Sequence, residues 1–72
     1  MEKKELTQEQ IKKISAGTGA NFTHISLVFS LLVADAQLLN NEHDLVEKAQ
    51  AAGVNLESSR VVEVAEAMRD FI

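Results

Sequence analysis

The chain has 72 residues, of which 46% are hydrophobic and 25% are charged, which indicates one small globular domain rather than a disordered chain. Its net charge of −4 at pH 7 argues against nucleic acid as a partner, because phosphate binding needs clustered lysine and arginine. The absence of cysteine excludes disulfides and thiolate metal sites, so tight packing or oligomerisation must stabilise a core this small.

No proline interrupts the chain, and its β-branched residues do not alternate with polar ones, which favours helices throughout. We therefore expect an all-α fold, a small three- to four-helix bundle with a central apolar helix that is completed by oligomerisation. Residues 1–72 would form a single helical domain, in which residues 1–6 are a flexible N-terminal arm.

The first helix is predicted to begin after Thr7, because Thr7 and Gln10 have the T-x-x-Q spacing of a capping box. It should end near Ala16, with Gly17 in the left-handed conformation that often closes a helix. Residues 17–19 would then be a short flexible connection.

The segment from Ile14 to Asn41 contains one formal charge, Asp35, in 28 residues. Asn21 is a suitable N-cap for a second helix in this segment, and we expect that helix to run to about Leu39. Its 18 residues from Phe22 include Asp35 and several polar side chains, so the sequence predicts no membrane span.

At 100° per residue, the apolar side chains of this second helix fall into two rows on different sides. The first row is Ile25, Phe29, Leu32, Ala36 and Leu39. The second row is Leu27, Leu31, Ala34 and Leu38. An ordinary surface helix has one apolar stripe, so a helix with two needs a partner on each side.

Two ways of covering both rows remain open. Either the other helices of the same chain cover them, or a second molecule covers one, most simply as a twofold dimer. The first predicted helix offers only Ile11 and Ile14, and the third is poor in large apolar residues. We therefore favour a second copy of the chain, or a different protein, on one row.

The third helix should be capped by Asn41, either as a separate element or as a kinked continuation of the second, and Gly53 should end it. The last helix should be capped by Asn55 or Ser58 and run to the C-terminus. One of its faces carries three acids that either dock a basic protein surface or are simply solvated. These acids are Glu63, Glu66 and Asp70.

Asp35 has two interpretations. In a dry interface its carboxylate would need a cation such as Lys48, Arg60 or Arg69. On the flank of the helix it would merely be solvated, and we favour the flank because His24 lies on the same side.

Patterns that would carry chemistry are incomplete. His43 and Glu47 have the i, i+4 spacing of two zinc ligands, but no third ligand is evident. The glycines of residues 17–21 follow a helix rather than a strand and lack the lysine of a phosphate-binding loop. Since no serine or threonine stands in a nucleophile pattern, we expect no enzyme, no cofactor and no metal site.

The function expected from these patterns is non-catalytic protein–protein interaction in the cytoplasm. The chain would be a homo-oligomeric adaptor, regulator or inhibitor that binds itself, most simply as a dimer, and possibly another protein. It would act through an apolar row of the second helix and the acidic face of the last. The predicted interaction residues are Ile25, Leu27, Phe29, Leu31, Leu32, Asp35, Leu38, Glu63, Glu66 and Asp70.

An alternative comes from residues 5–17, which read ELTQEQIKKISAG. This string resembles the leader of double-glycine bacteriocin precursors, which often read E-L-T-x-E-x-(L/M/I)-x-x-I before a small-residue cleavage site. The match covers 13 of the 72 residues, and Ala16-Gly17 stands where that family has Gly-Gly. The resemblance implies a secreted peptide precursor whose leader, residues 1–17, is removed after Gly17.

Overall fold

The computed structural model describes residues 6–72 and consists of helices joined by short connections. Within that range there are four α-helices, two 3₁₀ segments and no strand, so the predicted all-α fold is confirmed. The α-helices are α1 (Gln8–Thr18), α2 (Phe22–Ala34), α3 (Glu42–Ala51) and α4 (Ser58–Ala67). The 3₁₀ segments are η1 (Ala36–Asn40) and η2 (Arg69–Phe71).

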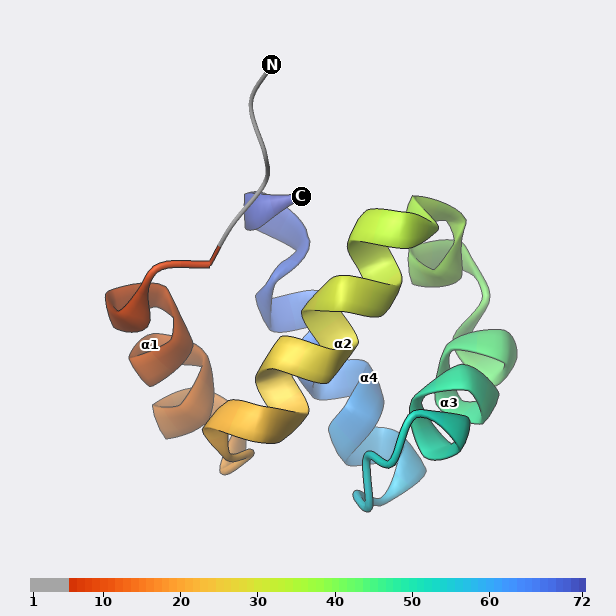
Figure 1. Ribbon diagram of the computed structural model, residues 1–72, viewed down its shortest axis with the longest axis horizontal. Coiled ribbons are helices and arrows are strands. Elements are labelled where there is room, and N and C mark those ends of the chain that lie inside the picture. The colour runs from red at the N-terminus through yellow and green to blue at the C-terminus, as the bar shows by residue number, and fades with distance from the viewer. Residues whose placement is uncertain (1–5) are drawn as a thin grey trace.

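α2 crosses the middle of the molecule in front of α4, with α1 on one side of this pair and α3 on the other (Figure 1). α4 contacts all three other α-helices. One side of α2 therefore faces α4, while the opposite side faces away from the bundle.

The core lies between α2 and α4 and is closed at its sides by α1 and α3. Its largest fully buried side chains are Ile25, Val28 and Leu32 of α2, Leu45 of α3, Val61 and Val64 of α4, and the loop residues Val54 and Met68. Each such side chain stabilises the fold by roughly 1.5–3 kcal/mol. α1 adds Ile11 and Ile14, which are 7% and 3% exposed.

α1 begins as predicted and ends later than predicted. Thr7 and Gln10 form the full capping box, with Gln10 N–H donating to Thr7 Oγ1 at 3.2 Å and Thr7 N–H donating to Gln10 Oε1 at 3.0 Å. Gly17 was expected to end the helix, but it lies inside α1, and Gly19 is the left-handed residue with φ 76°. The Gly19 N–H donates to the Ser15 carbonyl at 2.7 Å, which closes the last turn.

The connection from α1 to α2 was predicted to consist of residues 17–19, but Gly17 and Thr18 belong to α1. Thr18 Oγ1 donates to the Ile14 carbonyl at 2.7 Å and accepts from the Ala20 N–H at 3.3 Å. Ser15 Oγ donates to the Ala20 carbonyl at 2.7 Å, and Ala20 itself is buried. These bonds satisfy backbone groups of the turn, which would otherwise lack partners.

α2 was expected to reach Leu39 but ends at Ala34. Asp35 leaves the helical conformation (φ −150°, ψ 93°), and its Oδ1 accepts from the Gln37 N–H at 3.1 Å, which starts η1. A short acidic side chain that bonds to a nearby backbone N–H favours a cap over a helix interior. Asn21 caps the start of α2 as predicted, with its Oδ1 accepting from the His24 N–H at 2.9 Å.

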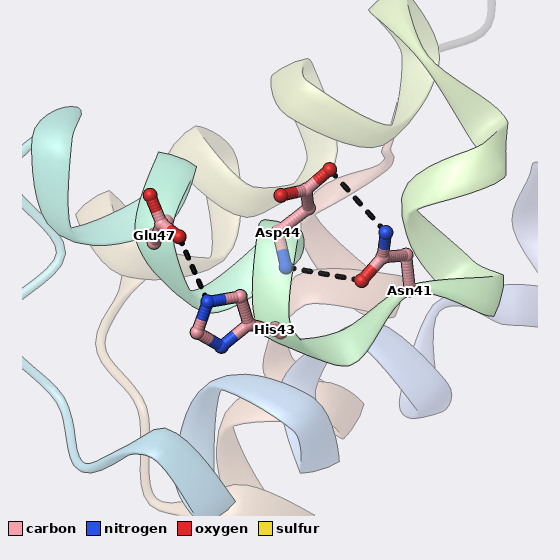
Figure 2. A network of polar contacts seen from close by, with 4 residues as sticks. All are labelled: Asn41, His43, Asp44 and Glu47. Carbon is pink, nitrogen blue, oxygen red and sulfur yellow. Dashed lines mark hydrogen bonds and ion pairs between the residues drawn. The ribbon is translucent and has the colours of Figure 1, made fainter.

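α3 is a separate helix with the cap that the sequence predicts. The Asp44 N–H donates to Asn41 Oδ1 at 3.2 Å, and Asn41 Nδ2 donates to Asp44 Oδ2 at 3.3 Å, so the two residues bond in both directions (Figure 2). At the other end Gly53 takes φ 102°, while the Val54 N–H donates to the Ala49 carbonyl at 2.9 Å. This hydrogen-bond pattern is a Schellman motif, and the residue that follows Gly53, Val54, is buried in the core.

Neither Asn55 nor Ser58 caps α4. Glu57 occupies the N-cap position without a side-chain hydrogen bond, and Ser58 is the first residue of the helix. α4 was expected to reach the C-terminus, but it ends at Ala67 and is followed by η2. Of the predicted N-terminal arm, residues 1–5 lie outside the described residues, and Leu6 packs against the core.

Candidate functional site

Four of the predicted interaction residues are core residues of the single chain. Ile25 and Leu32 are fully buried, and Phe29 and Leu38 are 8% and 3% exposed. These side chains are not exposed for contact with a second molecule, because α4 and its neighbours cover Ile25, Phe29 and Leu32 within the chain. Val28, which belongs to neither row, is also fully buried.

The second row is partly covered. Leu27 and Leu31 are half-buried and pack against the edge of the core, while Ala34 is exposed. Leu38 no longer continues this row, because it lies on η1 beyond the break at Asp35. Neither row, then, is an uncovered apolar stripe.

What α2 exposes instead is an uncharged surface, here called the outer face of α2. It consists of Phe22, Thr23, Ser26, Ser30, Val33 and Ala34. Phe22 is 59% exposed and Val33 is 45% exposed. Figure 1 shows α2 at the front of the bundle, with no helix in front of it.

This outer face differs in charge from the surfaces of the other helices. The other three α-helices each expose charged side chains. Examples are Lys12 and Lys13 on α1, Glu42 and Glu47 on α3, and Glu63 on α4. Residues 22–34 contain no Asp, Glu, Lys or Arg. A hollow of about 260 Å³ lies on this helix between Phe29, Ser30, Val33 and Ala34.

Asp35 lies at the end of the outer face and is exposed, as the flank interpretation predicts. Its carboxylate holds the Gln37 N–H in the turn that separates α2 from η1. Asp35 thus caps the start of η1, a role that neither interpretation from the sequence predicted.

The three predicted acids do not share one helix. Glu63 and Glu66 are exposed on α4, but Asp70 lies on η2, after the helix has ended. Glu63 and Glu66 line an open groove of about 480 Å³ between α1 and α4, together with Lys13. The acidic face is therefore shorter than predicted, and a lysine lies beside it.

A second open groove, of about 530 Å³, lies between α3 and α4 and is here called the α3/α4 groove. Its lining residues are Glu42, His43 and Val46 of α3 and Ser58, Ser59, Val62 and Glu63 of α4. Sequence reasoning missed this groove, because its two walls come from helices that are separated along the chain. Val46 and Val62, which line the groove from α3 and α4, are both half-buried.

The N-terminal half of α3 holds an exposed pair beside this groove. His43 Nε2 lies 2.9 Å from Glu47 Oε2, and the two side chains are 84% and 65% exposed (Figure 2). Among residues 6–72 no group of three or more His, Asp or Glu side chains is placed to hold a metal ion. His43 and Glu47 form an exposed i, i+4 contact on the surface of α3.

His24 lies in the first turn of α2 and is only partly exposed. Its Nδ1 atom is buried and has no hydrogen-bond partner within the described part of the chain. A buried polar atom without a hydrogen-bond partner lowers the free energy of unfolding, so the Nδ1 atom of His24 destabilises the fold.

The proposed leader junction lies inside the folded domain. Gly17 is a residue of α1, and the next residue, Thr18, is buried and bonded to Ile14 and Ala20. Cutting the chain after Gly17 would also detach Ile11 and Ile14 from the core. The precursor hypothesis stays a prediction.

No protein-family model, curated protein or solved structure matches this chain. Among residues 6–72, no single helix has both the length and the apolar character needed to cross a membrane. α1 and α2 meet those requirements only when taken together, and they are bent by 107°.

Proposed function

We propose that the protein is a non-catalytic interaction module that binds a second copy of itself through the outer face of α2. The observation that carries this proposal is the charge pattern of the surface. The outer face is uncharged over a whole helix and exposes Phe22 and Val33, whereas the exposed parts of α1, α3 and α4 are charged.

Charge also favours a second copy as the occupant. Two chains of net charge −4 repel each other, and the repulsion is weakest where the approaching faces carry no charge. A twofold dimer brings identical surfaces together, and an uncharged face can pair with itself without placing like charges opposite each other. The small side chains of Ser26, Ser30 and Ala34 would let two α2 helices approach closely.

The size of the face sets the strength of the association. A helix of 13 residues is about 20 Å long and about 10 Å wide. One such face buries less than the roughly 800 Å² per partner of a standard stable interface. We therefore expect a dimer that dissociates on dilution, as suits a regulator or adaptor whose outer face is exchanged between partners.

Sedimentation equilibrium tests the proposal, recorded by interference optics because the chain has no Trp or Tyr. The wild type should shift from monomer to dimer as its concentration rises. Ser30→Glu places one carboxylate from each copy in the interface and should remain monomeric. Ala51→Glu, an exposed change on α3 of the same charge, is the matched control and should dimerise like the wild type.

A wild type that stays monomeric up to millimolar concentration would contradict self-association. Equal weakening by both variants would mean that net charge, and not the outer face of α2, governs the association.

A further inference from the structure

The α3/α4 groove combines an apolar floor with charge of one sign. Val46 and Val62 are half-buried residues that line it from opposite sides. Glu42 on α3 and Glu63 on α4 are exposed and line it as well. No lysine or arginine is among its lining residues, unlike the groove between α1 and α4, where Lys13 lies near Glu63 and Glu66.

These surroundings match the two parts of a basic side chain. The methylene stem of lysine or arginine covers apolar surface, while its charged end stays in contact with water and with carboxylates. In this groove the stem would lie on Val46 and Val62, and the cationic end would lie between Glu42 and Glu63. The hydroxyls of Ser58 and Ser59 can accept further hydrogen bonds from an ammonium or a guanidinium group.

We propose that the α3/α4 groove binds a short basic segment of a partner protein through lysine or arginine side chains that alternate with small apolar residues. Charge complementarity carries the choice of this partner, because Glu42 and Glu63 are the carboxylates among the lining residues, which include His43 but no lysine or arginine, and the whole chain has a net charge of −4. The groove shares no residue with the outer face of α2, so this proposal stands independently of self-association.

The test is a titration of the ¹⁵N-labelled full-length chain with capped hexapeptides, followed by two-dimensional NMR at low ionic strength. The probe is an acetylated, amidated peptide of alternating valine and lysine. It should shift the amide signals of residues 42–46 and 58–63 in a saturable way. A peptide of alternating serine and lysine should bind more weakly, because it lacks the apolar contact.

Two double variants of equal charge separate the groove from general attraction. Glu42→Gln with Glu63→Gln should weaken binding about tenfold, as expected for the loss of two exposed ion pairs. Glu9→Gln with Asp70→Asn removes two exposed charges outside the groove and should change the affinity less than about twofold.

Three results would overturn the proposal. The first is equal weakening by the two double variants, and the second is the absence of saturable shifts. The third is equal or stronger binding of a peptide of alternating valine and glutamate, which would assign the groove to an anion at the uncapped start of α4.

Discussion

Arg60 of α4 donates a hydrogen bond from Nη1 to the carbonyl oxygen of Thr18 at 2.7 Å, joining residues 42 positions apart. The last carbonyls of a helix lack partners within the helix, and that end of the helix carries partial negative charge. Arg60 satisfies one such carbonyl and supplies a positive charge at the C-terminus of α1. The contact ties the first helix of the chain to the last.

Removing this contact should loosen α1. Arg60→Met keeps an unbranched apolar stem but loses the guanidinium donor, so we expect a loss of about 1–2 kcal/mol in the free energy of unfolding. Urea denaturation followed by circular dichroism at 222 nm measures this loss. Arg69→Met, at an exposed position on η2, is the control and should change the stability little. Equal effects of the two substitutions would mean that the Arg60 contact is not stabilising.

The glycines of the α1–α2 connection should respond in opposite directions to alanine. Gly17 is helical, and a Cβ there would meet no atom within 4 Å, so Gly17→Ala should stabilise the protein by about 0.5–1 kcal/mol. Gly19 has φ 76°, and a Cβ there would lie 2.7 Å from Arg60 Nη1, so Gly19→Ala should destabilise by more than about 1 kcal/mol. Thermal unfolding of the two variants side by side decides the matter. Destabilisation by Gly17→Ala would instead indicate that Gly17 is the left-handed residue that ends α1.

This contrast also shows what the sequence could and could not predict. Local patterns were sufficient for the all-α class and for the caps at Thr7, Asn21 and Asn41, because each cap depends on residues within three positions. The choice between Gly17 and Gly19 depends on Thr18, whose hydroxyl extends the helix, and on Arg60, which is far away in the chain. Such a distant contact leaves no local pattern.

The error on α2 has a different and local cause. Ideal helical geometry carried to Leu39 gave two continuous rows, but the Asp35 cap breaks the helix and redirects Leu38 and Leu39 onto η1. Val28, Ile25 and Leu32 are all fully buried within the single chain. The other helices of the chain therefore cover more of α2 than the periodicity of its apolar residues predicted. The outer face of α2 follows from this burial and was not evident from the rows.

The two predicted rows should now respond unequally to polar substitution. Leu32→Asp places a charge in a fully buried position and should abolish cooperative unfolding, because no cation is available in the apolar core around it. Leu27→Ser affects a half-buried side chain at the edge of the core and should leave a folded protein of lower thermal midpoint. Circular dichroism melts of both variants test whether Leu32→Asp is the more damaging change. A Leu32→Asp variant that melts cooperatively at or above the midpoint of Leu27→Ser would contradict the prediction.

His24 offers a stabilising substitution. Its buried Nδ1 atom lacks a hydrogen-bond partner, so exchange for an apolar side chain removes the cost of keeping that atom from water. We expect His24→Leu to raise the free energy of unfolding by roughly 1 kcal/mol. The exposed exchange His43→Leu is the control, since it removes only a surface contact with Glu47 and should not stabilise the fold. An unchanged or lowered stability of His24→Leu would show that the imidazole makes contacts worth more than its unpaired nitrogen costs.

Deleting residues 1–17 tests whether this chain is a leader followed by an independent peptide. The shortened chain, residues 18–72, lacks Ile11 and Ile14 and leaves Arg60 without a helix end to contact. Losing two buried isoleucines should remove roughly 4–10 kcal/mol, comparable to the whole stability of a small domain. We expect residues 18–72 to show weak helical signal and no cooperative thermal transition in circular dichroism. A well-folded 18–72 fragment would mean that α1 is dispensable for folding, as a removable leader must be.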